Sequence, residues 1–107
     1  TKVLVNYAGF LEDNGKLFDT NRAILARDYN MINPQREAQN GYTPIVMSYS
    51  KDAQLNPGFL EALLMMSVGD KVTAFVPSYL GYGERGAGNV IPPNADLVFE
   101  IEITAQK

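Results

Sequence analysis

The segment from residue 79 to residue 104 restricts the fold of this chain most strongly, because an irregular loop leads directly into a regular strand. From residue 97 onward the side chains alternate with the period of two that is typical of a strand. One face of this strand is apolar and carries Leu97, Phe99, Ile101 and Ile103. The loop before it excludes a helix because it contains Gly81, Gly83, Gly86, Gly88, Pro92 and Pro93. The sequence therefore predicts a strand with one buried face, entered from a long glycine-rich loop.

This glycine-rich loop is also more apolar than a solvated loop needs to be. Besides its glycines it holds Tyr79, Leu80, Tyr82, Val90 and Ile91. Aromatic and aliphatic side chains on a loop beside a firm strand are typical of one wall of a binding site. The alternative, on composition alone, is that these side chains only cover the core.

Composition excludes several classes of function. The chain has no histidine and no cysteine, so it contains no Ser-His-Asp or Cys-His catalytic arrangement, no disulfide and no histidine- or thiolate-ligated zinc. A net charge of −3 with scattered basic residues argues against nucleic-acid binding. No apolar run approaches the ~20 residues of a membrane span. We therefore expect no metal, no cofactor, no nucleic-acid partner and no membrane span.

Five strands and one central helix are predicted within a single domain that covers residues 1–107. The strands are expected at residues 2–11, 17–19, 44–50, 71–76 and 97–103. The first strand is apolar on both sides and is expected to be central, and Asn14-Gly15 after it suits a tight turn. Asn56-Pro57 has the residue types of a helix N-cap and first position, and Gly69 those of a stop after about Met66. The expected fold class is α+β, an antiparallel sheet over one short helix.

Residues 20–43 form a connection that is long for a compact domain, which suggests a functional or locally structured insertion. A passive surface excursion is an equally open alternative. A short helix is predicted at residues 23–27, with Asn21 as its cap. Just before the insertion, Asp19 follows Phe18 at the edge of the candidate pocket. Two interpretations of Asp19 stay open: a cap of the turn at Asn21, or a semi-buried hydrogen-bond acceptor.

The glycines at positions 81, 83 and 86 match the spacing of the dinucleotide-binding pattern. That pattern works only between a strand and a helix, whose N-terminus receives the pyrophosphate. Here Pro92-Pro93 and a strand follow, so nucleotide binding is not expected. The chain begins at Thr1 rather than methionine, from which we expect a processed product or an excised domain.

Six segments together resemble the FKBP family of peptidyl-prolyl cis–trans isomerases, the tacrolimus-binding immunophilins. In chain order they are residues 5–9 (VNYAG), 16–19 (KLFD), 57–59 (PGF), 66–69 (MSVG), 81–86 (GYGERG) and 91–99 (IPPNADLVF). The resemblance covers most of the chain outside the 20–43 segment. It implies an antiparallel sheet wrapped across one helix, with the active pocket between them. We also expect the domain to lack the family's leading strand, N-terminal to Val3.

The resemblance further implies the residues of the pocket. The catalytic group would comprise Tyr7, Phe18, Asp19, Phe59, Tyr82 and Phe99. Additional substrate contacts would come from Ile45, Leu55, Asn56, Val90 and Ile91. Phe59 is expected at the floor, and the hydroxyl of Tyr82 is expected to meet a ligand carbonyl. Asn56 stands where the family usually has Ile or Val, so it keeps the backbone amide donor but replaces an apolar contact with a polar side chain.

From the pocket and the resemblance we predict a peptidyl-prolyl cis–trans isomerase that acts on exposed X–Pro segments of unfolded or flexible proteins. Isomerisation makes and breaks no covalent bond, so a chain without histidine or cysteine can perform it. The alternative is an FKBP-like chaperone or binding module that holds proline-containing segments without catalysis. Tacrolimus-like macrolides are further expected ligands, and we expect a monomer. The insertion resembles those of bacterial envelope-attached members, which favours the periplasm or envelope over the cytoplasm.

Overall fold

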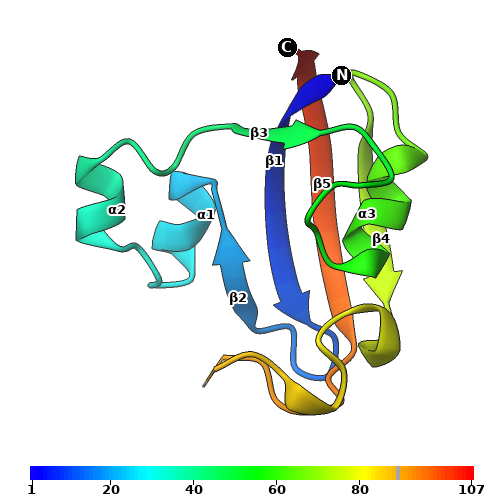
Figure 1. Cartoon of the computed structure of the whole chain (residues 1–107). Helices are drawn as coiled ribbons and strands as arrows, with labels where there is room; N and C mark the ends of the chain where they lie inside the picture. The colour runs from blue at the N-terminus through cyan, green and yellow to red at the C-terminus, as the bar shows by residue number, and fades with distance from the viewer. Residues whose placement is uncertain (89) are drawn as a thin grey trace.

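The computed structural model describes residues 1–88 and 90–107 and contains a five-stranded antiparallel sheet with one helix against its face (Figure 1). Along the chain the elements are β1 (Lys2–Leu11), β2 (Leu17–Thr20), α1 (Ala23–Asp28), α2 (Pro34–Ala38), β3 (Ile45–Ser48), α3 (Pro57–Leu64), β4 (Lys71–Val76), the 3₁₀ turns η1 (Ser78–Leu80) and η2 (Gly83–Arg85), and β5 (Leu97–Gln106). The expected α+β architecture is confirmed.

The strand order is β2-β1-β5-β4, and β3 pairs separately with β1. The first strand is thus central, as its two apolar faces predicted. On the edge of β1 opposite β5, β2 pairs with residues 8–10 and β3 pairs with residues 2–5. The strand predicted at residues 44–50 is shorter, because its partner β1 begins at Lys2, which pairs with Ser48. The chain between β2 and β3 leaves the sheet as α1 and α2, beside this edge (Figure 1).

The core lies between α3 and one face of the sheet. The apolar face predicted for β5 is confirmed, because its buried side chains are Leu97, Phe99, Ile101 and Ile103. From α3, Phe59 and Leu63 join the same cluster. Gly58 allows α3 to approach β4 closely, since a Cβ at this position would overlap the side chain of Val76. The start of α3 is therefore held firmly against the sheet.

Two local predictions made from Asn residues are confirmed. At the start of α3, Oδ1 of Asn56 accepts a hydrogen bond from the backbone N–H of Phe59 at 2.8 Å, and Pro57 is the first helical residue. Between β1 and β2, Gly15 has φ 70°, and the side chain of Asn14 accepts a hydrogen bond from the backbone N–H of Lys16 at 2.9 Å. The start of α3 and the turn between β1 and β2 are therefore each stabilised by contacts between residues two or three positions apart.

The predicted end of α3 was wrong. The helix ends at Leu64 rather than near Met66, and Gly69 is not its stop. The hydroxyl of Tyr49 donates to the carbonyls of Leu64 and Met66 at 3.0 and 2.8 Å. A side chain therefore satisfies the carbonyl of the last helical residue, Leu64, while the backbone N–H groups of Met65 and Met66 satisfy those of Ala62 and Leu63. Gly69, with φ 94°, instead forms the turn into β4 and donates to the carbonyl of Ile103 at 2.8 Å.

The insertion contains two short helices, of which only α1 was predicted. Asn21 is not its cap: the N-cap position is Arg22, and it makes no side-chain cap bond. Asn21 is 1% exposed and bonds three backbone groups, accepting from Tyr7 N–H at 2.8 Å and donating to the carbonyls of Val5 and Thr43 at 2.9 and 3.0 Å. Asn21 therefore ties both ends of the insertion to the central strand.

The second helix, α2, carries the same signature that identified α3. Asn33 precedes Pro34, and its side chain accepts from the N–H groups of Gln35 and Arg36 at 3.0 and 3.2 Å. An ion pair between Arg27 and Glu37 connects α1 to α2. Within the described parts of the chain, no helix has the length and apolar character needed to cross a membrane.

Candidate active site

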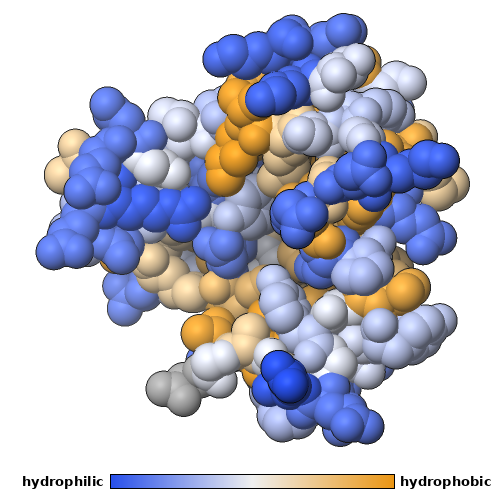
Figure 2. Space-filling view, in the orientation of Figure 1, coloured by the Kyte–Doolittle hydropathy of each residue, from blue (hydrophilic) through white to orange (hydrophobic). Residues whose placement is uncertain are grey.

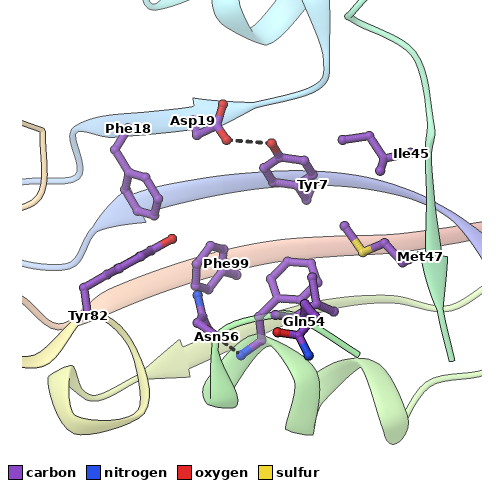
Figure 3. Close-up of a pocket in the computed structure, with 11 residues that line it drawn as sticks. Tyr7, Phe18, Asp19, Ile45, Met47, Gln54, Asn56, Tyr82 and Phe99 are labelled. Atoms are coloured by element: carbon purple, nitrogen blue, oxygen red, sulfur yellow. Dashed lines mark hydrogen bonds between the residues drawn. The ribbon is translucent and has the colours of Figure 1, made fainter. Parts of the chain in front are cut away.

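A cavity of about 240 Å³ opens between the start of α3, the sheet and the loop that follows β4. It is lined by Tyr7, Phe18, Asp19, Ile45, Met47, Gln54, Leu55, Asn56, Phe59, Tyr82 and Phe99. Figure 3 shows that these side chains come from β1, β2, β3, β5, the α3 start and the glycine-rich loop, and converge on one space. Hydrophilic side chains occupy much of the surface around the face onto which it opens (Figure 2).

Aromatic rings in mutual edge-to-face contact form the floor of the cavity. Phe99 lies 5.7 Å from Phe18 and 5.2 Å from Phe59, measured between ring centroids, and Tyr7 lies 6.2 Å from Phe59. All three contacts are within a few degrees of perpendicular. The ring of Phe18 packs closely against β1 because Gly9 has no side chain; a Cβ there would collide with the tip of the Phe18 ring. The floor is consequently apolar and free of charge.

A short polar chain forms one edge of the cavity. The hydroxyl of Tyr7 donates to Asp19 at 2.6 Å, and Arg36 donates to the other carboxylate oxygen at 3.2 Å. Arg36 is itself positioned by the carbonyl of Gly41 at 3.1 Å and by the ring of Tyr42, whose centroid lies 4.6 Å from its guanidinium. This places Asp19 as a hydrogen-bond acceptor, and decides between its two interpretations. Arg36 comes from α2, so the insertion contributes to the site.

The polar chain shifts the ionisation of its members. Burial, followed by the hydrogen bond to Asp19 and its negative charge, raises the pKa of Tyr7 to about 12. Burial alone would lower the pKa of Arg36, but the neighbouring Tyr7 and Asp19 outweigh it and the pKa is raised. At neutral pH the phenol of Tyr7 is therefore neutral and the guanidinium of Arg36 is charged. Both side-chain oxygens of Asp19 are already engaged, one by Tyr7 and the other by Arg36.

Two polar groups face the cavity from the opposite wall. Tyr82 extends from the loop after β4, is 40% exposed, and directs its hydroxyl toward the space between Phe18 and Phe99 (Figure 3). Asn56 lies at the first turn of α3, next to the floor ring of Phe59. In the described part of the chain, the glycines at positions 81, 83 and 86 are followed by an isolated bridge between Ala87 and Ile91 and then by β5.

Most residues predicted for the site line the cavity, but two do not. Val90 is 43% exposed on the loop, and Ile91 is 4% exposed and packs into the core. The reason is the backbone bridge between Ala87 and Ile91, which turns the Ile91 side chain inward. Sequence reasoning missed Met47, which could have been found because it shares a strand face with Ile45.

Two further contributors were not predicted from the sequence. Gln54 lies in the loop before α3 and lines the cavity. Arg36 reaches Asp19 across an interval of 17 residues, through a helix that the sequence analysis did not predict. Among residues 1–88 and 90–107, no cluster of three or more acidic side chains is placed to hold a metal ion. The cavity therefore offers shape, aromatic surface and hydrogen-bond donors.

Comparison with known proteins agrees with this geometry. Residues 1–104 match the family model of FKBP-type peptidyl-prolyl cis-trans isomerases. The chain belongs to that family. It is 39% identical to FK506-binding protein 2 of Kluyveromyces lactis over 101 residues, which cover 94% of this chain and 59% of the relative. It is 33% identical to peptidyl-prolyl cis-trans isomerase FPR2 of Saccharomyces cerevisiae, with 99% of this chain and 65% of the relative covered.

A solved peptidyl-prolyl cis-trans isomerase has the same fold. The crystal structure of a peptidyl-prolyl cis-trans isomerase from Pseudomonas syringae matches with a TM-score of 0.68 at 31% identity, covering 99% of this chain and 62% of that one. The FKBP-type domain described here thus spans about three fifths of the length of these relatives.

The raised pKa of Tyr7 predicts a specific loss of stability in alkali. The folded state holds the Tyr7 proton up to about pH 12, whereas the unfolded chain releases it near pH 10. Stability linked to this group is thus complete below pH 10 and is lost as the pH rises toward 12, by about 2 kcal/mol. Urea unfolding at stepped pH should show a shallower decline for Tyr7→Phe. The exposed control Tyr79→Phe should follow the wild-type curve, and equal slopes for Tyr7→Phe and wild type would contradict the assignment.

Proposed function

We propose that this FKBP-type domain accelerates the cis–trans isomerisation of X–Pro bonds in flexible protein segments. The observation that carries the proposal is the uncharged aromatic floor of Phe18, Phe59 and Phe99, which lies beneath an opening lined by hydrogen-bond donors. A proline ring is compact and apolar, and a floor of this kind suits it. Family membership supports the same reaction, because family members are peptidyl-prolyl cis-trans isomerases.

The cavity can lower the rotation barrier without a reactive group. Rotation about the amide has a barrier of about 18–20 kcal/mol, because resonance is lost in the twisted state. The twisted amide has less charge separation than the planar one, so a dehydrated apolar surface stabilises it relative to the ground state. We expect Tyr82 and the backbone amide of Asn56 to orient the carbonyls on either side of the bond. Each tenfold rate increase needs about 1.4 kcal/mol of such differential binding.

The test is a protease-coupled assay on proline tetrapeptides, supported by NMR exchange measurements on peptides that need no protease. Tyr82→Phe removes one hydroxyl that faces the cavity, and should lower kcat/KM about fivefold to tenfold with little change in stability. Tyr79→Phe, on an exposed ring outside the cavity lining, is the matched control and should keep the wild-type rate. No acceleration by the wild-type domain at micromolar concentration would refute the proposal.

A second candidate function, binding of proline-containing segments without catalysis, is favoured by one observation. A second cavity of about 170 Å³ lies beside the first, shares Phe18 and Asp19 with it, and is lined by Arg36 and Tyr42 of the insertion. A chain that extends past the proline site would contact this polar surface. This candidate predicts that peptide affinity is measurable while the exchange rate of the bound proline equals that of the free peptide.

The proposal also covers the partners, the origin and the location of the domain. We expect its partners to be unfolded or flexible chains with accessible prolines, and tacrolimus-like macrolides as competing ligands, since relatives are named for binding FK506. Four properties remain predictions: a bacterial origin, a chaperone role, a monomeric state and an extracytoplasmic location. Competition of tacrolimus in the isomerase assay tests the macrolide part directly.

A further inference from the structure

The oxygen and the NH₂ group of the Asn56 side-chain amide face different surroundings. Its Oδ1 accepts from the backbone N–H of Phe59 at 2.8 Å and so caps α3. A backbone N–H can only donate, so the atom that faces it must be the amide oxygen. The amide NH₂ group is consequently turned away from the helix. Figure 3 shows it directed toward Phe99 and the open space of the cavity.

This NH₂ group is a donor held in place before any ligand arrives. Asn56 is half-buried in the cavity wall, and among the described residues its Nδ2 has no acceptor. The cap restrains the side chain, so little freedom is left to lose when a ligand binds. A ligand that enters displaces water from this donor. Unless the ligand supplies an acceptor, the donor is left without a hydrogen bond.

We infer that Nδ2 of Asn56 selects among X–Pro segments by donating to an acceptor side chain on a residue adjacent to the proline. This inference rests on the proposed function, since it names the substrate class of the same site. Segments with Asp, Asn, Glu or Gln beside the proline are preferred over segments with aliphatic residues there. The acidic group across the cavity, Asp19, is neutralised by Arg36 and hydrogen-bonded by Tyr7, so it repels an acidic substrate only weakly.

Two substitutions of Asn56 separate the effect of its Nδ2 donor from the effect of its cap on α3. Asn56→Ser keeps a good N-cap but removes the donor from the cavity. Asn56→Asp keeps the cap and the shape, and replaces the NH₂ group with an oxygen that repels acceptors. Asn14→Ser is the matched control, because Asn14 also accepts a backbone N–H through Oδ1 but lies in the exposed turn after β1. Thermal unfolding confirms that each variant is folded.

The substrates are proline peptides in which Leu, Asn or Asp occupies the position before or after the proline, since these three side chains branch alike. In at least one position, the wild-type domain should prefer Asn over Leu by about fivefold to tenfold in kcat/KM. The preference should fall below about twofold in Asn56→Ser, and Asn56→Asp should discriminate against the Asp peptide. Asn14→Ser should keep the wild-type preference. If Asn56→Ser fails to fold, Asn56→Asp decides alone.

The outcomes distinguish this inference from the proposed function. If the wild type accelerates the peptides but the Asn-to-Leu ratio is the same in the Asn56 variants at both positions, the inference is overturned and the function stands. If the wild type accelerates no peptide, the proposed function fails. In that case the Asn-to-Leu preference is measured instead as a ratio of dissociation constants, determined by calorimetry. A ratio lost in the Asn56 variants supports the inference, and a ratio unchanged or absent overturns it.

Discussion

Phe59→Ala is expected to abolish measurable isomerase activity and to lower the free energy of unfolding by about 3–5 kcal/mol. The Phe59 ring is only 5% exposed, and it belongs both to the core and to the cavity floor. Its edge-to-face contacts with Tyr7 and Phe99 would be lost, and the neighbours can fill the void only in part. Urea unfolding gives the stability change, and NMR exchange on a proline peptide gives the rate.

Because this substitution removes both core and floor, a second variant is needed to separate them. Phe59→Leu fills most of the space and should cost about 1–2 kcal/mol, which leaves a folded domain. Its kcat/KM should still fall about tenfold, since an aliphatic side chain cannot provide the flat aromatic floor. Phe75→Ala, on an exposed ring of β4, is the control and should change neither quantity. A folded Phe59→Leu with wild-type activity would contradict the role given to the ring.

Asn21→Ala is expected to lower the free energy of unfolding by a similar amount, about 3–5 kcal/mol. The substitution leaves the N–H of Tyr7 and the carbonyls of Val5 and Thr43 without their buried partner. Each such group costs about 1–3 kcal/mol when buried and unpaired. The base of the insertion should therefore open, and hydrogen exchange at residues 20–43 should accelerate more than in the rest of the domain.

Asn14→Ala is the comparison for this prediction. Asn14 also bonds a backbone N–H, that of Lys16, but in an exposed turn where water can replace it. Its loss should cost below about 1 kcal/mol. If the two alanine variants were equally stable, the buried network of Asn21 would not be what closes the insertion. Equal hydrogen exchange inside and outside the insertion in Asn21→Ala would lead to the same conclusion.

Local patterns in the sequence predicted the sheet and the helix α3 because each element carries its own signal. The alternation in β5 follows directly from which face is buried, and Asn56-Pro57 satisfies the first turn of α3 with its own atoms. The end of α3 could not be found in this way, because the hydroxyl of Tyr49, from outside the helix, bonds the carbonyl of its last residue, Leu64. The same holds for Asn21, whose partners lie 14 to 22 residues away.

The cavity shows the same division between local and distant causes. Its aromatic floor was predicted from the resemblance to the FKBP family, whose motifs surround Phe18, Phe59 and Phe99. Val90 and Ile91 were misplaced because the Ala87–Ile91 bridge sets their orientation. Arg36 was missed because it reaches the site through a contact with Asp19, from which it is separated by 17 positions in the sequence.

The aromatic residues of the floor were predicted from the resemblance to the FKBP family. By itself, the sequence determined the α+β architecture, the central place of β1 and the absence of histidine or cysteine chemistry. These properties depend on periodicity, on caps and on which residue types are present, and all of them act over a few residues or over composition. Only the tertiary structure decided where α3 ends and how the insertion is anchored. Those depend on hydrogen bonds between groups that the folded chain brings together, and their geometry does not exist until the sheet and α3 have packed.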